Sequence, residues 1–309
     1  MTIEKVETPF GGANMILETG KLAKQADGAV TVQLGGTMVL VTACVSREAR
    51  ESIDFFPLTV EYQEKTYAAG RIPGGFFKRE GRPSESEILI SRLIDRPVRP
   101  LFPEGFRNEV QVMALVLSSD AENDPDVLAV VGASAALGIS SIPFQGPIGA
   151  CRVGRVDGQF ILNPTYAQRE AGDMDIIVVG TREKVVMIEG ESKELKESVI
   201  FDALKFGHKS LQVSIDIQEA FIKKAGVAKM TFKDKSVSVD LVKNIRSGYM
   251  PKIKEICAIA QKEQRIEASD MLYKEISEKF CVEKEEDRVC DADIKGALDK
   301  IEQEEIRRL

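Results

Sequence analysis

Apolar and polar residues alternate in short stretches over the first two thirds of the chain, and this period of two is typical of strands with one buried face. β-branched residues on both sides of Gly35-Gly36-Thr37 predict a hairpin. Asp157-Gly158 and Thr181-Arg182-Glu183 mark the turns of two more predicted hairpins. The expected strands are 30–34, 38–45, 58–62, 110–117, 148–156, 159–162, 173–180 and 184–189. We therefore expect sheets to dominate this part of the chain.

Helical periodicity interrupts these strands three times. Ser84-Glu85-Ser86-Glu87 has the pattern of a capping box, in which the serine caps the first turn and the glutamate reaches back. Asp124-Pro125-Asp126 opens a second helix, with aspartate as the cap and proline at the first helical position. A third helix is expected over 193–224, although 213–217 alternates like a strand. This mixture predicts an α/β (α+β) domain with mixed sheets and packed helices.

The pattern changes after Gly226, where charged residues become denser and strand patterns fade. Helices are expected from Met250-Pro251 onward, over 268–280 and over 291–309. We therefore predict two domains, 1–228 and an all-helical domain over 229–309. The last helix has no glycine at its C-terminal end, as expected for a piece of a longer polypeptide.

Composition and charge exclude several classes of protein. The chain has 42 Lys and Arg against 49 Asp and Glu, a net charge of -7, which excludes a generally basic nucleic-acid binder but leaves room for a local basic site. The hydrophobic share of 43% is that of an ordinary globular protein with a sizeable core. The most apolar stretch, 127–139, is shorter than the ~20 residues of a membrane-spanning helix. No segment has the pattern of a targeting signal.

Cysteine and histidine usage argues against metal and disulfide sites. The five cysteines are widely spaced and form no CxxC pair, which favours reduced thiols in a cytoplasmic protein over a disulfide framework or a structural zinc site. His208 is the only histidine, so metal centres built from several histidines are excluded. Its apolar neighbours indicate a packed or surface position on a helix.

A glycine-rich loop is predicted over 69–83, where four glycines and two prolines interrupt any regular element. Two aromatic residues and two cations stand together in Phe76-Phe77-Lys78-Arg79. Single-stranded nucleic acid suits such a group, because bases stack on rings while cations bind phosphates. In the alternative, the phenylalanines fold into the core and the cations form a solvated face.

Further cations follow this loop, and cations outnumber anions over 71–107. Arg92, Arg96 and Arg99 have the spacing of one helix face, although Pro97 disfavours helical geometry at the residue before it. The candidate nucleic-acid contacts are Phe76, Phe77, Lys78, Arg79, Arg82, Arg92 and Arg96.

The chain resembles the bacterial polynucleotide phosphorylase family over essentially its whole length, most weakly in the helical tail. The resemblance rests on GRIPGGFFKREGRPS at 70–84, followed by LIDRPVRPLFP at 93–103, and continues through 132–137, 147–150 and 162–165. Members of that family carry two RNase PH-type domains joined by a helical domain, then two small RNA-binding domains. The resemblance implies that 1–228 is the first RNase PH-type domain, with its β-α-β fold, and that 229–309 is the helical domain.

The resemblance implies a phosphorolytic 3′-to-5′ exoribonuclease that needs Mg²⁺. In the family reaction, inorganic phosphate attacks the 3′-terminal phosphodiester and releases a nucleoside 5′-diphosphate. The family forms a ring-shaped homotrimer, in which Phe76-Phe77-Lys78-Arg79 would grip single-stranded RNA at a constriction of the central channel. Lys78 stands where many relatives have arginine, so this chain would lose planar stacking and bidentate phosphate contact there.

The family's catalytic machinery lies in the second RNase PH-type domain, and the resemblance implies a silent copy here. A serine cluster at a helix N-terminus binds phosphate in the active domain, whereas Asp124-Pro125-Asp126 places two carboxylates there and should repel it. Asp173-Met174-Asp175 keeps the shape of the metal-side pattern, but Arg169 replaces an aspartate and Ile177 a lysine. We expect the two aspartates of that motif to be a solvated strand start, with no catalytic or metal-binding residue in this chain.

Three interpretations remain open at this point. The chain is part of a polynucleotide phosphorylase that guides RNA and builds the ring, a free-standing active exonuclease, or a non-enzymatic RNA-binding or scaffold module. The replaced residues argue against the second. Partners in RNA-degradation complexes, the role of the helical domain and any RNA sequence preference are not determined by the sequence.

Overall fold

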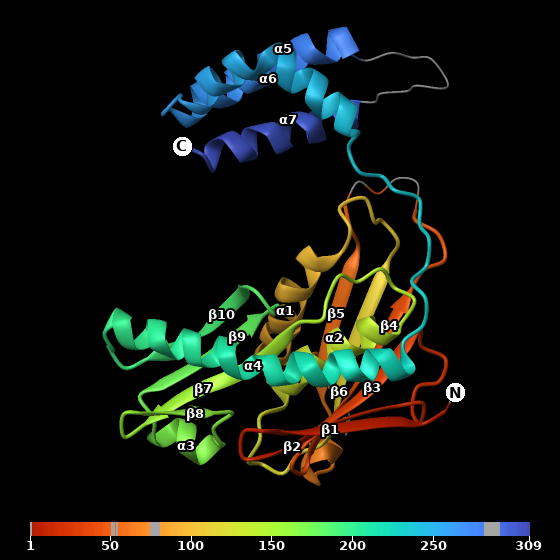
Figure 1. Cartoon of the computed structure of the whole chain (residues 1–309), viewed down its shortest axis with the longest axis vertical. Helices are drawn as coiled ribbons and strands as arrows, with labels where there is room; N and C mark the ends of the chain where they lie inside the picture. Colours follow the sequence, from red (N-terminus) through yellow and green to blue (C-terminus); the bar gives the residue numbers. More distant parts are fainter. Residues whose placement is uncertain (1, 51–52, 54, 75–80, 281–290) are drawn as a thin grey trace. The chain divides into compact units, whose positions relative to one another are not determined.

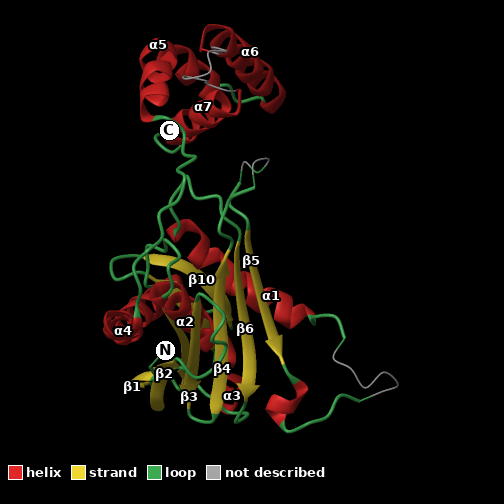
Figure 2. Ribbon diagram, turned by 90° about the vertical axis from the view of Figure 1, so that its right-hand side faces the viewer, coloured by secondary structure: helices red, strands yellow, loops and turns green. Residues whose placement is uncertain are grey.

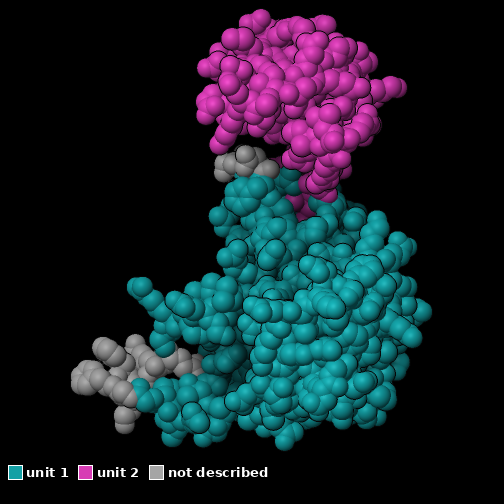
Figure 3. Space-filling view, turned by 90° about the vertical axis from the view of Figure 1, so that its left-hand side faces the viewer, with its two compact units in different colours: residues 1–103, 107–232 teal, residues 104–106, 233–309 magenta. Residues whose placement is uncertain are grey.

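The computed structural model describes residues 2–50, 53, 55–74, 81–280 and 291–309. The described chain divides into two compact units, which Figure 3 colours separately. Unit 1 comprises 1–103 and 107–232, and unit 2 comprises 104–106 and 233–309. The sequence pattern put this division between residues 228 and 229, in the segment that follows the last helix of unit 1.

Unit 1 contains a six-stranded mixed sheet in the order β1-β2-β3-β4-β6-β5, seen in Figure 2. Its strands are β1 (Glu4–Phe10), β2 (Ala13–Thr19), β3 (Gly28–Leu34), β4 (Thr37–Val45), β5 (Leu58–Glu64) and β6 (Val110–Ser118). Only β5 and β6 run parallel; the other neighbouring pairs are antiparallel. The predicted β3–β4 hairpin is confirmed, and Gly35 at its turn has a positive φ of 58°.

A second sheet of four antiparallel strands has the order β10-β9-β7-β8. Its strands are β7 (Gly149–Val156), β8 (Gln159–Leu162), β9 (Met174–Gly180) and β10 (Val185–Ser192). Both remaining hairpins are therefore confirmed. Asp157 and Gly158 both have positive φ, as a two-residue hairpin turn requires.

Helices pack against both sheets (Figure 1). The helices of unit 1 are α1 (Glu85–Val98), α2 (Pro125–Ile139), α3 (Tyr166–Ala171) and α4 (Glu197–Ala225), with short 3-10 helices η1 (Thr66–Ala69) and η2 (Arg99–Leu101). Every residue of α2 is buried, because this helix contacts β3 and β4 of one sheet, β7 of the other, and α4. The apolar stretch that is too short for a membrane span is therefore a core helix.

Unit 2 contains three helices, α5 (Val239–Cys257), α6 (Lys262–Phe280) and α7 (Asp291–Ile306). Their apolar faces form a separate core that includes Ile245, Ile253, Ile276 and Ile301. This confirms the predicted helical region after the mixed α/β part. In the described part of the chain, no helix combines the length and the apolar character needed to cross a membrane.

The start of one helix was predicted wrongly. The helix expected from Met250-Pro251 starts at Val239, where Ser238 caps it, and Pro251 lies inside it. The helix expected over 193–224 is confirmed as α4, and the alternating residues 213–217 continue it, since the helix packs on both sheets and tertiary contacts outweigh a local pattern. The N-terminal hairpin of β1 and β2 and the short α3 were not predicted.

Candidate catalytic and RNA-binding sites

The predicted RNA contacts fall into two groups. Phe76, Phe77, Lys78 and Arg79 lie outside the described residues. Arg82 precedes α1, and Arg92 and Arg96 lie on that helix; all three are exposed. These three arginines are therefore accessible to a polyanion.

A complete capping box starts α1, as predicted. The Ser84 hydroxyl accepts from the Glu87 N–H at 3.2 Å, and the Glu87 carboxylate accepts from the Ser84 N–H at 2.6 Å. The helix continues through Pro97 to Val98, so Arg96 is helical although the proline after it disfavours that geometry. A proline in the last turn removes one N–H there and leaves the preceding turns intact.

Five charged side chains form a partly buried network where the sequence placed the silent catalytic site. Arg152, on β7, donates to Asp175 at 2.6 Å and to Asp124 at 3.3 Å, and it also bonds to Asp126. Arg169, on α3, donates to Asp124 at 2.5 Å and to Asp175 at 2.7 Å. The two guanidinium groups thus bind all three carboxylates, and we call these five residues the Arg152 network.

This arrangement corrects one prediction. Asp175 was expected to be a solvated strand start, but its side chain is only 16% exposed and bonds to two arginines. Its neighbour Asp173 pairs with Arg155 at 2.5 Å. Arg152 itself was missed, although an arginine inside the apolar run of β7 is a signal for a buried ionic partner.

The N-terminus of α2 offers no free anion site at its first donors. The Asp124 carboxylate accepts from the Asp126 N–H at 3.3 Å, and the Asp126 carboxylate accepts from the Val127 N–H at 2.5 Å. Pro125 contributes no N–H. Protein carboxylates therefore already occupy the positions that a phosphate oxygen would need.

Burial and charge oppose each other in the network. Burial raises the pKa of Asp126 above its ordinary value; the Arg152 guanidinium opposes this shift, while the Asp124 carboxylate adds to it. For Arg152, burial favours the neutral form, but the surrounding aspartates raise its pKa and keep it charged. The charged forms of Asp126 and Arg152 therefore depend on the ion pair between them, because an unpaired buried charge is strongly unfavourable.

The network lines a cleft of about 540 Å³. Ile177 and the α1 residues Leu89 and Ile90 form apolar parts of its wall, so the position of the family's lysine presents no base. The carboxylates do not fit a divalent cation, because each one bonds to a guanidinium, and the described residues contain no cluster of three or more possible ligands. The Asp126 and Asp175 carboxylates that line this cleft are therefore held by guanidinium groups.

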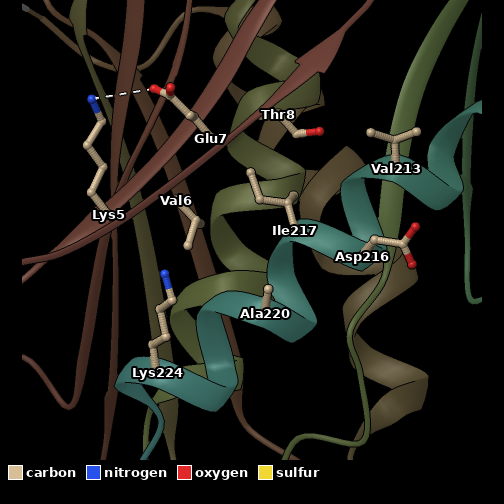
Figure 4. A pocket seen from close by; sticks show the side chains of 9 residues that line it. All are labelled: Lys5, Val6, Glu7, Thr8, Val213, Asp216, Ile217, Ala220 and Lys224. Carbon is tan, nitrogen blue, oxygen red and sulfur yellow. Dashed lines mark ion pairs between the residues drawn. The ribbon is translucent and has the colours of Figure 1, made fainter.

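A second hollow lies between β1 and α4, with a volume of about 820 Å³ (Figure 4). Lys5 and Glu7 on β1 form an ion pair at 3.7 Å, and Asp216 and Lys224 extend from α4. None of the predicted site residues lines it. Its alternating charges do not converge on one point, and we assign it no chemistry.

Family comparisons agree with this description. The two domain models of the "3' exoribonuclease family", domain 1 and domain 2, match residues 12–143 and 146–210. A third model, "Polyribonucleotide nucleotidyltransferase, RNA binding domain", matches 240–309. Together these models span nearly all of both units.

Curated relatives carry the name polyribonucleotide nucleotidyltransferase. The relative from Geotalea uraniireducens is 49% identical over 98% of this chain, and that from Rhodospirillum centenum is 61% identical over 68%. The chain covers 43% and 30% of their respective lengths. It therefore spans less than half of the curated relatives that it matches.

Solved structures support the fold. A chain of the Archaeoglobus fulgidus exosome with RNA bound to the active site has a TM-score of 0.52 and 17% identity, covering 71% of this chain and 88% of that chain. Rice (Oryza sativa) Rrp46 also has a TM-score of 0.52, with 15% identity, covering 71% of this chain and 93% of that chain. The family models, the relatives and this fold agree, and the chain belongs to the 3′ exoribonuclease family.

Proposed function

We propose that this chain is the RNA-guiding part of a polyribonucleotide nucleotidyltransferase, whose catalytic site lies outside it. One observation carries the proposal: the five side chains of the Arg152 network pair with one another where a catalytic site would lie. The whole protein would degrade RNA from its 3′ end with inorganic phosphate as co-substrate. Mg²⁺ would bind outside this chain, since the three carboxylates of the Arg152 network are already paired with guanidinium groups.

Exposed arginines support the guiding role. Arg82, Arg92 and Arg96 are exposed, and they follow closely along the chain after Phe76-Phe77-Lys78-Arg79, the segment that resembles the family's RNA-gripping loop. Phe76-Phe77-Lys78-Arg79 would supply the stacking rings and two more cations of the same loop. The name of the family model over 240–309 supports a contribution of unit 2 to RNA binding.

Further properties follow for the whole protein. We expect a homotrimeric ring, a role in mRNA degradation and a cytoplasmic location. Reduced thiols fit that location, because the five cysteines have no disulfide-like spacing. A free-standing RNA-binding or scaffold module without catalysis is the second candidate, since the silent site favours it for the isolated chain.

A phosphorolysis assay tests the proposal. The 309-residue chain is incubated with a labelled oligoribonucleotide, phosphate and Mg²⁺, and nucleoside diphosphates are measured. We expect no release, together with RNA binding that weakens as salt increases. Phosphate-dependent release would contradict the silent site, and absence of RNA binding would contradict the guiding role.

Assaying the complete gene product beside the 309-residue chain distinguishes the two candidates. Phosphate-dependent release by the complete protein, absent from the 309-residue chain, supports the enzyme. No release by the complete protein supports the scaffold module.

A further inference from the structure

Helix α1 lies along the open edge of the six-stranded sheet (Figure 2). The edge strand is β5, and side chains from α1 and the residue after it bond to its outward backbone groups. The Ser91 hydroxyl accepts from the Tyr62 N–H at 3.0 Å, and the Glu87 carboxylate accepts from the Glu64 N–H at 2.9 Å. The Arg99 guanidinium donates to the Leu58 carbonyl at 3.1 Å. These bonds protect most of an edge that would otherwise pair with another strand.

Between these bonds, one backbone donor and one backbone acceptor of β5 have no partner among the described residues: the N–H and the carbonyl of Val60. Backbone groups of a strand alternate sides, and Leu58, Tyr62 and Glu64 all use outward groups, so Val60 faces outward as well. No side chain or loop backbone in the described part of the chain bonds to the Val60 N–H or carbonyl. The edge thus presents a single free N–H beside free carbonyl groups.

This pair lies in a hollow of about 640 Å³ between β5 and α1, which we call the β5–α1 hollow. Its lining comprises Leu58, Thr59, Val60, Glu61, Tyr62, Gln63, Pro83, Ile88, Ser91, Arg92, Asp95 and Arg99. Ile88 is 51% exposed and offers an apolar surface. Asp95 is neutralised by Arg99 at 2.6 Å, which leaves Glu61 and Arg92 as the remaining charges.

Arg92 is available to a ligand. Its side chain is exposed and makes no ion pair or hydrogen bond with the described residues. It stands on the same wall as Ile88, one helical turn further along α1. A flat ring against Ile88 would therefore have a cation within the same hollow for an attached phosphate.

We propose that the β5–α1 hollow is a subsite for one nucleotide of single-stranded RNA, with the base edge on the Val60 backbone, the ring against Ile88 and the phosphate on Arg92. The subsite rests on the proposed RNA-guiding function. Unpaired bases carry a donor and an acceptor side by side, and proteins read them through such edges and through ring packing.

A base fits this edge better than a protein strand. An added strand needs a row of free donors and acceptors along the edge, whereas the Tyr62 and Glu64 N–H groups and the Leu58 carbonyl already bond to side chains. A base needs one donor and one acceptor. The near-neutral lining also suits an uncharged base ring, and Arg92 at one end of the hollow suits the charged phosphate that is attached to it.

Val60→Pro tests the backbone contact directly. Proline removes the N–H, and an edge strand tolerates it where that N–H faces away from the sheet. Val60→Ala is the matched control, because it trims the side chain and keeps the N–H. Binding of AMP, GMP, CMP and UMP, each alone, is followed by amide NMR of the 309-residue chain, and an oligoribonucleotide is titrated in parallel.

We expect mononucleotides to shift the signals of Val60, Ile88 and Arg92. Val60→Pro should weaken mononucleotide binding about twofold to tenfold relative to Val60→Ala. If Val60→Pro does not fold, Ile88→Ser replaces it, with Leu89→Ser as the control, because Leu89 is equally exposed on α1 and lines the other cleft.

The outcomes separate the subsite from the function. Equal binding by Val60→Pro and Val60→Ala, or no shifts at these residues, overturns the subsite even where the oligoribonucleotide binds. Shifts with a short extended peptide but not with nucleotides assign the hollow to a protein strand and also overturn it. If mononucleotides shift these signals and Val60→Pro abolishes the shifts, the subsite is supported. If the oligoribonucleotide does not bind in the same experiment, the guiding function is contradicted.

Discussion

Removing Arg152 tests whether the Arg152 network stabilises unit 1. This side chain is 8% exposed and bonds to three aspartates. Arg152→Met keeps much of its volume but leaves Asp124 and Asp175 with Arg169 alone and Asp126 with no bonded cation. Breaking a buried ion pair by removing one partner costs about 3–5 kcal/mol, and we expect a loss in that range at pH 7.

The loss should depend on pH with a definite sign. Without Arg152, burial and the Asp124 carboxylate raise the folded-state pKa of Asp126 further above the unfolded value. A group raised in this way contributes stability at low pH that is lost as pH rises through its folded pKa. The deficit of the variant relative to the wild type should therefore be larger at pH 8 than at pH 5.

Hydrogen exchange followed by mass spectrometry measures this effect within unit 1. Peptides over 149–180 report the opening free energy around the network, and peptides over α5 serve as an internal reference in unit 2. Arg50→Met is the matched control, because its ion pair with Glu109 is exposed and should contribute less than about 1 kcal/mol. A loss in Arg152→Met no larger than that of the control, or a deficit that grows toward pH 5, would refute the reasoning.

Three further predictions concern other sites. Desolvation raises the pKa of Asp120, but hydrogen bonds from Asn123, Glu122 and Gly36 outweigh it and hold that pKa well below its usual range. Asp120→Asn should therefore lose about 1–2 kcal/mol in urea unfolding at pH 7, and the difference from wild type should shrink below about pH 4. Lys229 donates to three carbonyls near the end of α2 at 2.8–2.9 Å, so Lys229→Met should lose about 1–2 kcal/mol in the exchange of α2 amides, whereas Lys229→Arg should lose less. Arg92→Ala should lower the slope of log affinity for single-stranded RNA against log salt by about 0.7, and an unchanged slope would remove it from the RNA path.

Local signals account for the elements that the sequence predicted well. Gly35-Gly36 and Asp157-Gly158 supply turn residues that few others can replace, so the β3–β4 and β7–β8 hairpins were predictable. Ser84 with Glu87 similarly marked the start of α1. The β1–β2 hairpin has a comparable turn signal in Gly11-Gly12, with Gly11 at a positive φ of 74°, but it was missed because β1 is an edge strand whose residues are mostly half-buried or exposed.

The candidate catalytic site was only partly predictable. The substitutions at Arg169 and Ile177 and the carboxylates at the start of α2 could be read along the chain. Arg152 could not be joined to them, because its partners Asp126 and Asp175 are 26 and 23 residues away and meet it only when β7, β9 and α2 pack together. The sequence alone indicated which residue types stand at these positions, whereas the ion pairs between them could be seen only in the folded structure.

The Arg152 network also limits which substitutions unit 1 accepts. An acidic residue at position 169 would add a carboxylate beside Asp124 and Asp175 and remove one of their two cations. Loss of Arg152 would instead leave three carboxylates with one arginine. Each single substitution thus gives a less stable protein, so we expect these five positions to change together rather than one at a time.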